Sequence, residues 1–176
     1  MAAELKGKKT EADLMAAYAA ECMSAVKYGF YADRAAAEGH AALEELFRAA
    51  AKNERAHAGV WFRVLTGGVK DTGANLRDAV KGEGYESGEM YARFCREAET
   101  EGFLDIARLF SDIAAVETAH AAAFKEAENA LTQNRLYEDD APARWRCGSC
   151  GCQKTAELAP DGCPVCGAGL GQFKKL

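Results

Sequence analysis

A chain of 176 residues, 49% of them hydrophobic, can bury one full core and leave room for a small second module. Its net charge of -5 and its scattered Lys and Arg residues give no basic stripe, which argues against nucleic acid or an anionic membrane surface as a target. The N-terminus has no apolar signal-like segment, and no apolar run is long enough to cross a bilayer. We therefore expect a soluble cytoplasmic protein that acts on small molecules or protein partners.

The first 131 residues have the pattern of four long helices. Proline is absent before Pro142, alanine is abundant, and glycines stand where helices should end, at Gly39, Gly67, Gly68 and Gly102. We expect the first helix over residues 11–38, the second over 41–66 and the fourth over 103–131. The third should begin with a short helical piece near 75–81 and end before Gly102.

Signals at the two ends of this helical region set its boundaries. Thr10 and Asp13 resemble a capping box, which predicts that the first helix starts near Glu11. After the fourth helix the helical period is lost and charge accumulates, so residues 132–144 are expected to form a linker. From Trp145 onward, Cys, Gly and Pro dominate, which indicates a separate small module.

An internal repeat relates the two halves of the helical region. A shift of 63 residues superposes five pairs of identical residues, Tyr28/Tyr91, Gly39/Gly102, Phe47/Phe110, Glu54/Glu117 and His57/His120. A helical hairpin used twice, with an approximate two-fold relation, explains these matches and predicts a four-helix bundle with two similar halves.

Polar residues occupy the apolar stripes of the predicted helices. Glu54-x-x-His57 and Glu117-x-x-His120 lie in the middle of stripes with helical spacing, and Glu21 has the same place in the first helix. A single Glu-x-x-His pair is more often a solvated surface pair, but here both pairs lie on the core side and match under the repeat. Buried carboxylates need a counter-charge, and no Lys or Arg occupies these levels. A pair of metal ions is the natural partner.

The repeat breaks in the third helix. The position equivalent to Glu21 is Gly84, with Glu83 and Glu86 on either side, so we expect a local bulge that lets both carboxylates point inward. The seven candidate metal ligands are Glu21, Glu54, His57, Glu83, Glu86, Glu117 and His120.

The donor types restrict the metal. Carboxylates with one or two imidazoles suit iron or manganese better than copper. Five ionised glutamates and two divalent ions together have a net charge of about -1. The net charge is the same when the two ions are trivalent and an oxide bridges them. A site balanced in both states favours redox chemistry over a static structural role.

The C-terminal module contains two Cys-x-x-Cys pairs. Cys147, Cys150, Cys163 and Cys166 can close a tetrahedral four-sulfur site around zinc or a single redox-active iron. From the cysteines alone, a structural zinc site is at least as probable as an iron site. The neighbouring predicted pair of metal ions favours an iron that carries electrons. Trp145 and Phe173 are expected to form the apolar core of this module.

Over nearly its whole length the sequence resembles the rubrerythrin family. The resemblance rests on the opening ELKGKKTEADL, Glu21, the two Glu-x-x-His motifs, the segment GEGYESGEMY and the short-spaced cysteine module. It implies a mainly α fold: a ferritin-like bundle over residues 1–131, a linker over 132–144 and a rubredoxin-like iron-binding domain over 145–176.

The resemblance also implies a function and roles for the ligands. Rubrerythrins are non-haem di-iron peroxidases that reduce hydrogen peroxide to water in oxidative-stress defence. Electrons would reach the oxo-bridged di-iron centre through the four-cysteine iron, from rubredoxin or an NAD(P)H-dependent rubredoxin reductase, in a homodimer or higher oligomer. Glu54 and Glu117 would bridge the irons, Glu21, Glu83 and His120 would be terminal ligands, and one iron would exchange between His57 and Glu86.

Two questions stay open at this stage. Tyr28 and Tyr91 match family tyrosines near the metals, where they would donate hydrogen bonds to ligating carboxylates, but from spacing alone they are equally well core aromatics. The function could instead be that of a ferroxidase that handles ferrous iron, or of a scaffold with zinc in both sites. The extra Glu86 and the cysteine module favour the peroxidase.

Overall fold

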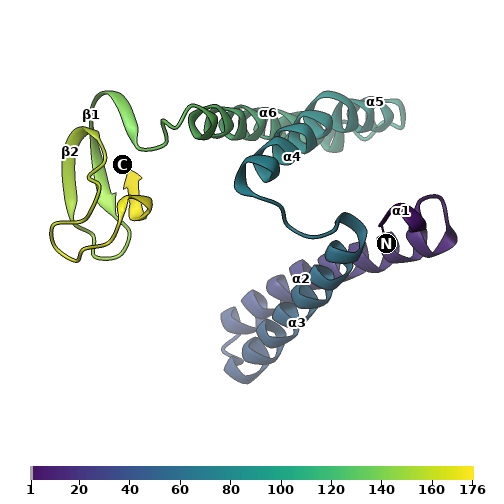
Figure 1. The fold of residues 1–176 in the computed structure, drawn as a ribbon. Coiled ribbons are helices and arrows are strands. Elements are labelled where there is room, and N and C mark those ends of the chain that lie inside the picture. The colour runs from purple at the N-terminus through teal and green to yellow at the C-terminus, as the bar shows by residue number, and fades with distance from the viewer. Residues whose placement is uncertain (1) are drawn as a thin grey trace. The chain divides into compact units, whose positions relative to one another are not determined.

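A computed structural model of the chain describes residues 2–176, which divide into two compact units between Lys70 and Asp71 (Figure 1). Four long helices in two hairpins and a small three-stranded sheet confirm the predicted mainly α organisation. Among the described residues, no helix has both the length and the apolar character needed to span a bilayer.

The first unit is a hairpin of two helices, preceded by the short α1 (Ala2–Leu5). The hairpin consists of α2 (Lys9–Ala37) and α3 (Ala41–Thr66) and is called here the first hairpin. The predicted capping box was wrong. Helix α2 begins at Lys9, so Thr10 lies inside the first turn instead of before it, and the N-cap Lys8 makes no side-chain cap bond. The Glu11 carboxylate accepts a hydrogen bond of 2.6 Å from the Gly7 N–H instead.

The second unit begins with a hairpin of the same kind, the second hairpin. Its first arm is α4 (Thr72–Tyr85), the π-helical segment η1 (Glu86–Met90) and α5 (Tyr91–Thr100), and its second arm is α6 (Leu104–Thr132). Helix α4 starts three residues before the predicted Asn75. Its start is fixed by Asp71, whose Oδ1 accepts a hydrogen bond of 2.9 Å from the Ala74 N–H.

The two hairpins turn in the same way. Gly39 and Gly102 adopt left-handed conformations with φ of 78° and 85°. The next residue then bonds back into the preceding helix, from the His40 N–H to the Ala35 carbonyl at 2.9 Å and from the Phe103 N–H to the Ala98 carbonyl at 2.8 Å. Because Ala35 and Ala98 are also buried, the repeat read from the sequence is a repeat of structure.

The π-helical segment accounts for the break in that repeat. Before the segment, equivalent residues are 62 apart, as in Leu14/Leu76 and Glu21/Glu83, whereas after it they are 63 apart, as in Tyr28/Tyr91. A π turn closes its hydrogen bond one residue further along than an α turn, so it absorbs one inserted residue. The bond from the Tyr91 N–H to the Glu86 carbonyl is of this wider kind. The expected bulge is therefore confirmed.

The C-terminal module is an antiparallel sheet in the order β2-β1-β3, formed by β1 (Glu138–Cys147), β2 (Gln153–Leu158) and β3 (Phe173–Lys175), with the 3₁₀ turn η2 (Leu170–Gln172) before β3. Strand β1 begins inside the segment expected to be a linker, because Glu138 pairs with Leu158. Trp145 and Phe173 are buried in its core, as predicted, and the Trp145 indole donates a hydrogen bond of 3.0 Å to the Ala156 carbonyl.

Candidate metal centres

The first hairpin brings together three of the predicted ligands. Glu21 comes from α2 and Glu54 and His57 from α3, and their ligand atoms lie within 4.8 Å of one another. His57 Nδ1 is 3.2 Å from Glu54 Oε2 and 3.7 Å from Glu21 Oε2. Donors at bonds of about 2.1 Å on opposite sides of an ion are about 4 Å apart, so this first triad can hold one ion.

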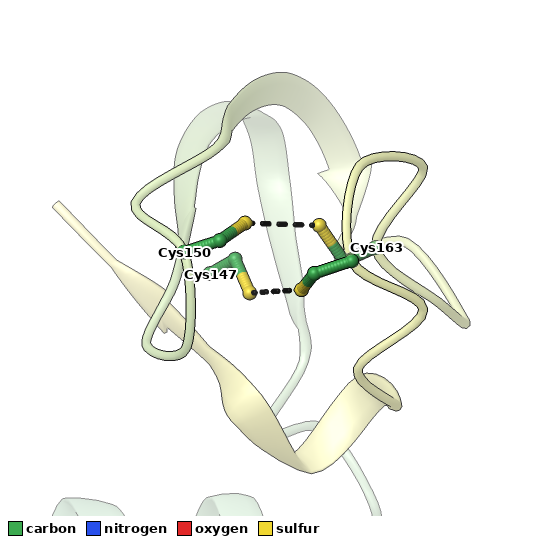
Figure 2. Close-up of side chains that lie close together, drawn as sticks. Cys147, Cys150 and Cys163 are labelled. Atoms are coloured by element: carbon green, nitrogen blue, oxygen red, sulfur yellow. Dashed lines mark hydrogen bonds between the residues drawn. The ribbon is translucent and has the colours of Figure 1, made fainter.

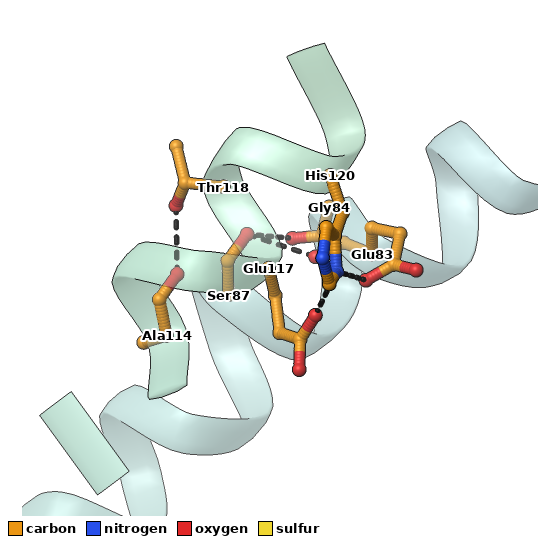
Figure 3. A network of polar contacts seen from close by, with 7 residues as sticks. All are labelled: Glu83, Gly84, Ser87, Ala114, Glu117, Thr118 and His120. Carbon is orange, nitrogen blue, oxygen red and sulfur yellow. Dashed lines mark hydrogen bonds and ion pairs between the residues drawn. The ribbon is translucent and has the colours of Figure 1, made fainter. Parts of the chain in front are cut away.

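The second hairpin repeats the arrangement with Glu83 from α4 and Glu117 and His120 from α6 (Figure 3). His120 Nδ1 is 2.7 Å from Glu117 Oε2 and 3.7 Å from Glu83 Oε2. The carboxylates of this second triad are half-buried, at 23% and 17% exposure. Two triads with the same donors at equivalent positions are the carboxylate and imidazole set that suits iron.

The charges of the carboxylates depend on their neighbours in each triad. In the first triad a hydrogen bond from the Glu21 carboxyl, together with His57, lowers the pKa of Glu54. In the second triad burial, followed by the hydrogen bond with Glu117, raises the pKa of Glu83. In each triad the neighbouring carboxyl groups therefore affect one another, and a bound cation would favour the ionised form of the ligands.

Glu86 lies outside both triads, at the first position of η1. Its negative charge still contributes to the raised pKa of Glu83, after burial and Glu117. The junction is held by Ser87, whose hydroxyl donates a hydrogen bond of 2.8 Å to the Glu83 carbonyl (Figure 3). Ser87 was not among the predicted site residues, because a serine in a helical pattern gives no signal of such a role.

Tyr28 and Tyr91 lie in matching aromatic clusters. The rings of Tyr28 and Phe47 are 6.4 Å apart, and those of Tyr91 and Phe110 are 5.9 Å apart. A third ring completes each cluster, Tyr31 in the first hairpin and Phe94 in the second. The two tyrosines are therefore packed as aromatics, and their bonding to ligand carboxylates stays a prediction.

The four predicted cysteine ligands converge in the C-terminal module (Figure 2). The Cys147 and Cys166 sulfurs are 3.8 Å apart, and those of Cys150 and Cys163 are 3.5 Å apart. Tetrahedral bonds of about 2.3 Å place sulfurs about 3.8 Å from one another, so the cluster has the size of a four-thiolate metal site.

Backbone N–H groups stabilise two of these sulfurs as thiolates. Hydrogen bonds from the backbone of Cys166 and then Val165 lower the pKa of Cys163 to about 6, despite its burial. In the other knuckle, the backbone N–H of Cys150 lowers the pKa of Cys147. A backbone hydrogen bond from Cys152 acts to lower the pKa of Cys150, but hydrogen bonds with the Cys166 and Cys163 sulfurs raise it to about 12. Thiolates are the form that binds metal, so binding of an ion would release the proton of Cys150.

Known proteins of one family are similar to this chain over most of its length. The rubrerythrin family model covers residues 13–128. Rubrerythrin of Nitratidesulfovibrio vulgaris is 32% identical over 98% of this chain and 96% of its own length. Rubrerythrin-1 of Clostridium acetobutylicum is 35% identical over 92% and 91%, and rubrerythrin of Porphyromonas gingivalis is 32% identical over 98% and 92%. The chain belongs to the rubrerythrin family.

Family membership confirms the ferritin-like fold class with a rubredoxin-like module, and it confirms iron as the metal of the carboxylate and histidine sites. As a rubrerythrin, the chain is a di-iron oxidoreductase of oxidative-stress defence. The role of each individual ligand in this rubrerythrin stays a prediction, as do its electron donor and its oligomeric state.

Proposed function

We propose that this rubrerythrin is a peroxidase that reduces hydrogen peroxide to water with electrons that enter through the four-cysteine site. The proposal is carried by the presence, in one chain, of a thiolate site for a one-electron metal and two glutamate and histidine triads. Peroxide reduction consumes two electrons and two protons and yields two molecules of water. Two irons supply those two electrons when bound.

In this proposal Glu54 and Glu117 would each bind both metals, and Glu21 and Glu83 would be terminal ligands. His57 Nδ1 and His120 Nδ1 lie 3.2 Å and 2.7 Å from the carboxylates of Glu54 and Glu117, which supports placing each of these glutamates beside a histidine ligand. His120 would stay a ligand throughout, while His57 and Glu86 would alternate at the other metal. Tyr28 and Tyr91 would orient ligand carboxylates from their aromatic clusters.

We further propose that electrons come from rubredoxin or an NAD(P)H-dependent rubredoxin reductase, and that the enzyme works in the cytoplasm as a homodimer or larger homo-oligomer. The peroxidase is preferred over a ferroxidase because a protein that only oxidises and passes on ferrous iron has no need of an electron-carrying module.

The test is peroxide consumption by the iron-loaded full chain, with NADH, a rubredoxin reductase and rubredoxin as reductants. We expect peroxide-dependent NADH oxidation that exceeds ferrous iron oxidation by oxygen, measured at equal protein concentration, by an order of magnitude or more. If the reduced protein reacted faster with oxygen and ferrous iron than with peroxide, it would be a ferroxidase.

Cys147→Ser separates the two metal sites. We expect this variant to lose the red colour of the thiolate iron and the NADH-linked turnover. Its chemically reduced triads should still be oxidised by a single addition of peroxide, and its helical circular dichroism should be unchanged. The electron route would be contradicted if the Cys147→Ser variant kept the red colour. It would also be contradicted if the purified wild type were colourless and held zinc in the four-cysteine site.

A further inference from the structure

We infer that Tyr18 and Trp61, beside the first triad, supply the second electron to hydrogen peroxide when the metal centre holds only one. This role rests on the proposed function, because the peroxide concerned is the one reduced at the proposed centre. Tyr18 and Trp61 are called here the aromatic pair. Their place in the first hairpin, and their absence from the second, point to this role.

Both members of the aromatic pair lie at the same end of the first triad. Tyr18 is three residues before Glu21 on α2, and Trp61 is four residues after His57 on α3. Residues at these spacings share a helix face, about 4.5 to 6 Å apart along the axis. Because α2 and α3 run in opposite directions, both steps lead away from the hairpin turn. The Tyr18 ring is also 6.1 Å from that of Phe62, the neighbour of Trp61.

The polar tips of the two side chains are not accounted for by packing alone. Tyr18 and Trp61 are both half-buried. The Nε1 atom of Trp61 is fully buried and has no hydrogen-bond partner among the residues that the structure describes, which costs free energy. Burial and, after it, a hydrogen bond with Cys22 raise the pKa of Tyr18. The hydroxyl therefore keeps its proton at neutral pH and can give up an electron and a proton together.

The second hairpin has no such pair. At the equivalent positions it has Val80 and Phe124, which fill space in an apolar stripe but resist oxidation. Tyrosine and tryptophan are the aromatic side chains that lose an electron most readily. The other tyrosine of α2 with a predicted role, Tyr28, is seven residues from Glu21, which is about 10 Å along the helix. The aromatic pair is therefore the nearest oxidisable group that distinguishes one triad from the other.

The proposed electron route explains why such a group is needed. A four-cysteine iron passes electrons one at a time, whereas peroxide takes up two. A centre that has received one electron would cleave the O–O bond into a hydroxide ion and a hydroxyl radical, which attacks neighbouring ligands.

Tyr18 changes the products of this cleavage. Peroxide then receives one electron from the centre, one electron and one proton from the Tyr18 hydroxyl, and one further proton from solvent. The products are two water molecules and a tyrosyl radical. The next electron from the four-cysteine site, with a proton, restores Tyr18. Trp61 lies at the same end of the triad and serves as a second source of the same electron.

Freeze-quench electron paramagnetic resonance tests this inference. The full chain with Cys147→Ser has no thiolate iron that could supply the second electron, so it is the parent. It is loaded with iron, brought with limiting dithionite to one electron per centre, and mixed with hydrogen peroxide. We expect a tyrosyl radical whose spectrum narrows when tyrosine is deuterated. Adding Tyr18→Phe should replace it with a tryptophan radical, and Tyr18→Phe with Trp61→Phe should remove both.

Trapping of hydroxyl radicals gives a second measurement. A spin trap should collect several-fold more hydroxyl radical from the variant that lacks both aromatics than from its parent. Tyr31→Phe is the matched control, because Tyr31 is 45% exposed and the second hairpin has Phe94 at the equivalent position. It should behave like the parent in both measurements. Iron content and helical circular dichroism show that each variant is folded and loaded.

The outcomes distinguish this inference from the proposed function. A parent without a protein radical, or a radical that persists unchanged after both substitutions, overturns the role of the aromatic pair. If the wild type nevertheless turns over peroxide with rubredoxin and its reductase, the peroxidase stands. If Tyr18 is oxidised as expected but the wild type does not turn over peroxide, the electron source stands and the peroxidase fails.

Discussion

The two hairpins of this rubrerythrin share one plan and differ at one place. Both end their first arm at a left-handed glycine, both carry a triad of two glutamates and a histidine, and both place a tyrosine in a cluster of three rings. Of the two hairpins, only the second contains the π-helical η1, which has Glu86 at its first position. One inserted residue thus separates a hairpin with three candidate ligands from a hairpin with four.

This difference shows how a repeated metal-binding unit can become asymmetric without losing its frame. The π turn absorbs the insertion within a few residues, so Tyr91 returns to the position that matches Tyr28. The two triads therefore keep equivalent positions in the two hairpins, while η1 begins with a further carboxylate, Glu86, which lies outside both triads.

The largest effect is expected at Glu86 itself. Glu86→Ala should slow oxidation of the reduced protein by peroxide roughly 10-fold or more, the scale on which losing one supporting group acts at a metal site. Iron content should stay nearly intact, because both triads remain. Met23, the equivalent position in α2, is 66% exposed and offers the matched control, so Met23→Ala should leave stopped-flow peroxide rates unchanged. Equal rates for both variants would show that Glu86 has no special role.

A smaller effect is expected at the serine that holds the junction. Ser87→Ala removes the hydrogen bond to the Glu83 carbonyl and should lower the free energy of unfolding by about 1 kcal/mol. The repeat places Ser24 at the equivalent position of the uninterrupted α2. Ser24→Ala should be neutral or slightly stabilising, because alanine is the better helix former. Chemical denaturation of both variants checks the contrast, and equal losses would mean that the π turn places no special demand on Ser87.

The smallest effect is expected at the helix starts, which also differ between the hairpins. Asp71 caps α4, whereas Lys8 before α2 makes no side-chain cap bond. The hydrogen bond from the Ala74 N–H lowers the pKa of Asp71, so its contribution to stability is full above the unfolded pKa and is lost as the pH falls through the folded pKa.

Asp71→Ala should therefore lower Tm by a few degrees at neutral pH, and the difference from the wild type should disappear in acid, below the normal range of aspartate pKa values. Thermal unfolding followed by circular dichroism at both pH values measures this. Lys8→Ala is the matched control and should change Tm little at either pH. A difference that persisted in acid would mean that the Asp71 carboxylate is not what fixes the start of α4.

Local spacing along the chain was enough to predict several features of the fold and the sites. Residues three apart on a helix project together, so Glu54 with His57 and Glu117 with His120 were predictable as pairs. Left-handed glycines marked the hairpin turns, and the slipped repeat at Gly84 located the π turn. The cysteine spacing predicted the four-sulfur cluster, because two knuckles of this length close around one ion.

Features that depend on neighbours distant in the chain could not be predicted from local spacing. The start of β1 at Glu138 depends on its pairing with Leu158, a partner that no local pattern reveals. The pKa of Glu54 is lowered by Glu21 from another helix, and that of Glu83 is raised by burial and Glu117, although the two triads look identical as motifs. Local spacing fixes which side chains share a face of a helix. The pKa of a carboxyl group and the pairing of a strand depend instead on neighbours that folding brings from elsewhere in the chain.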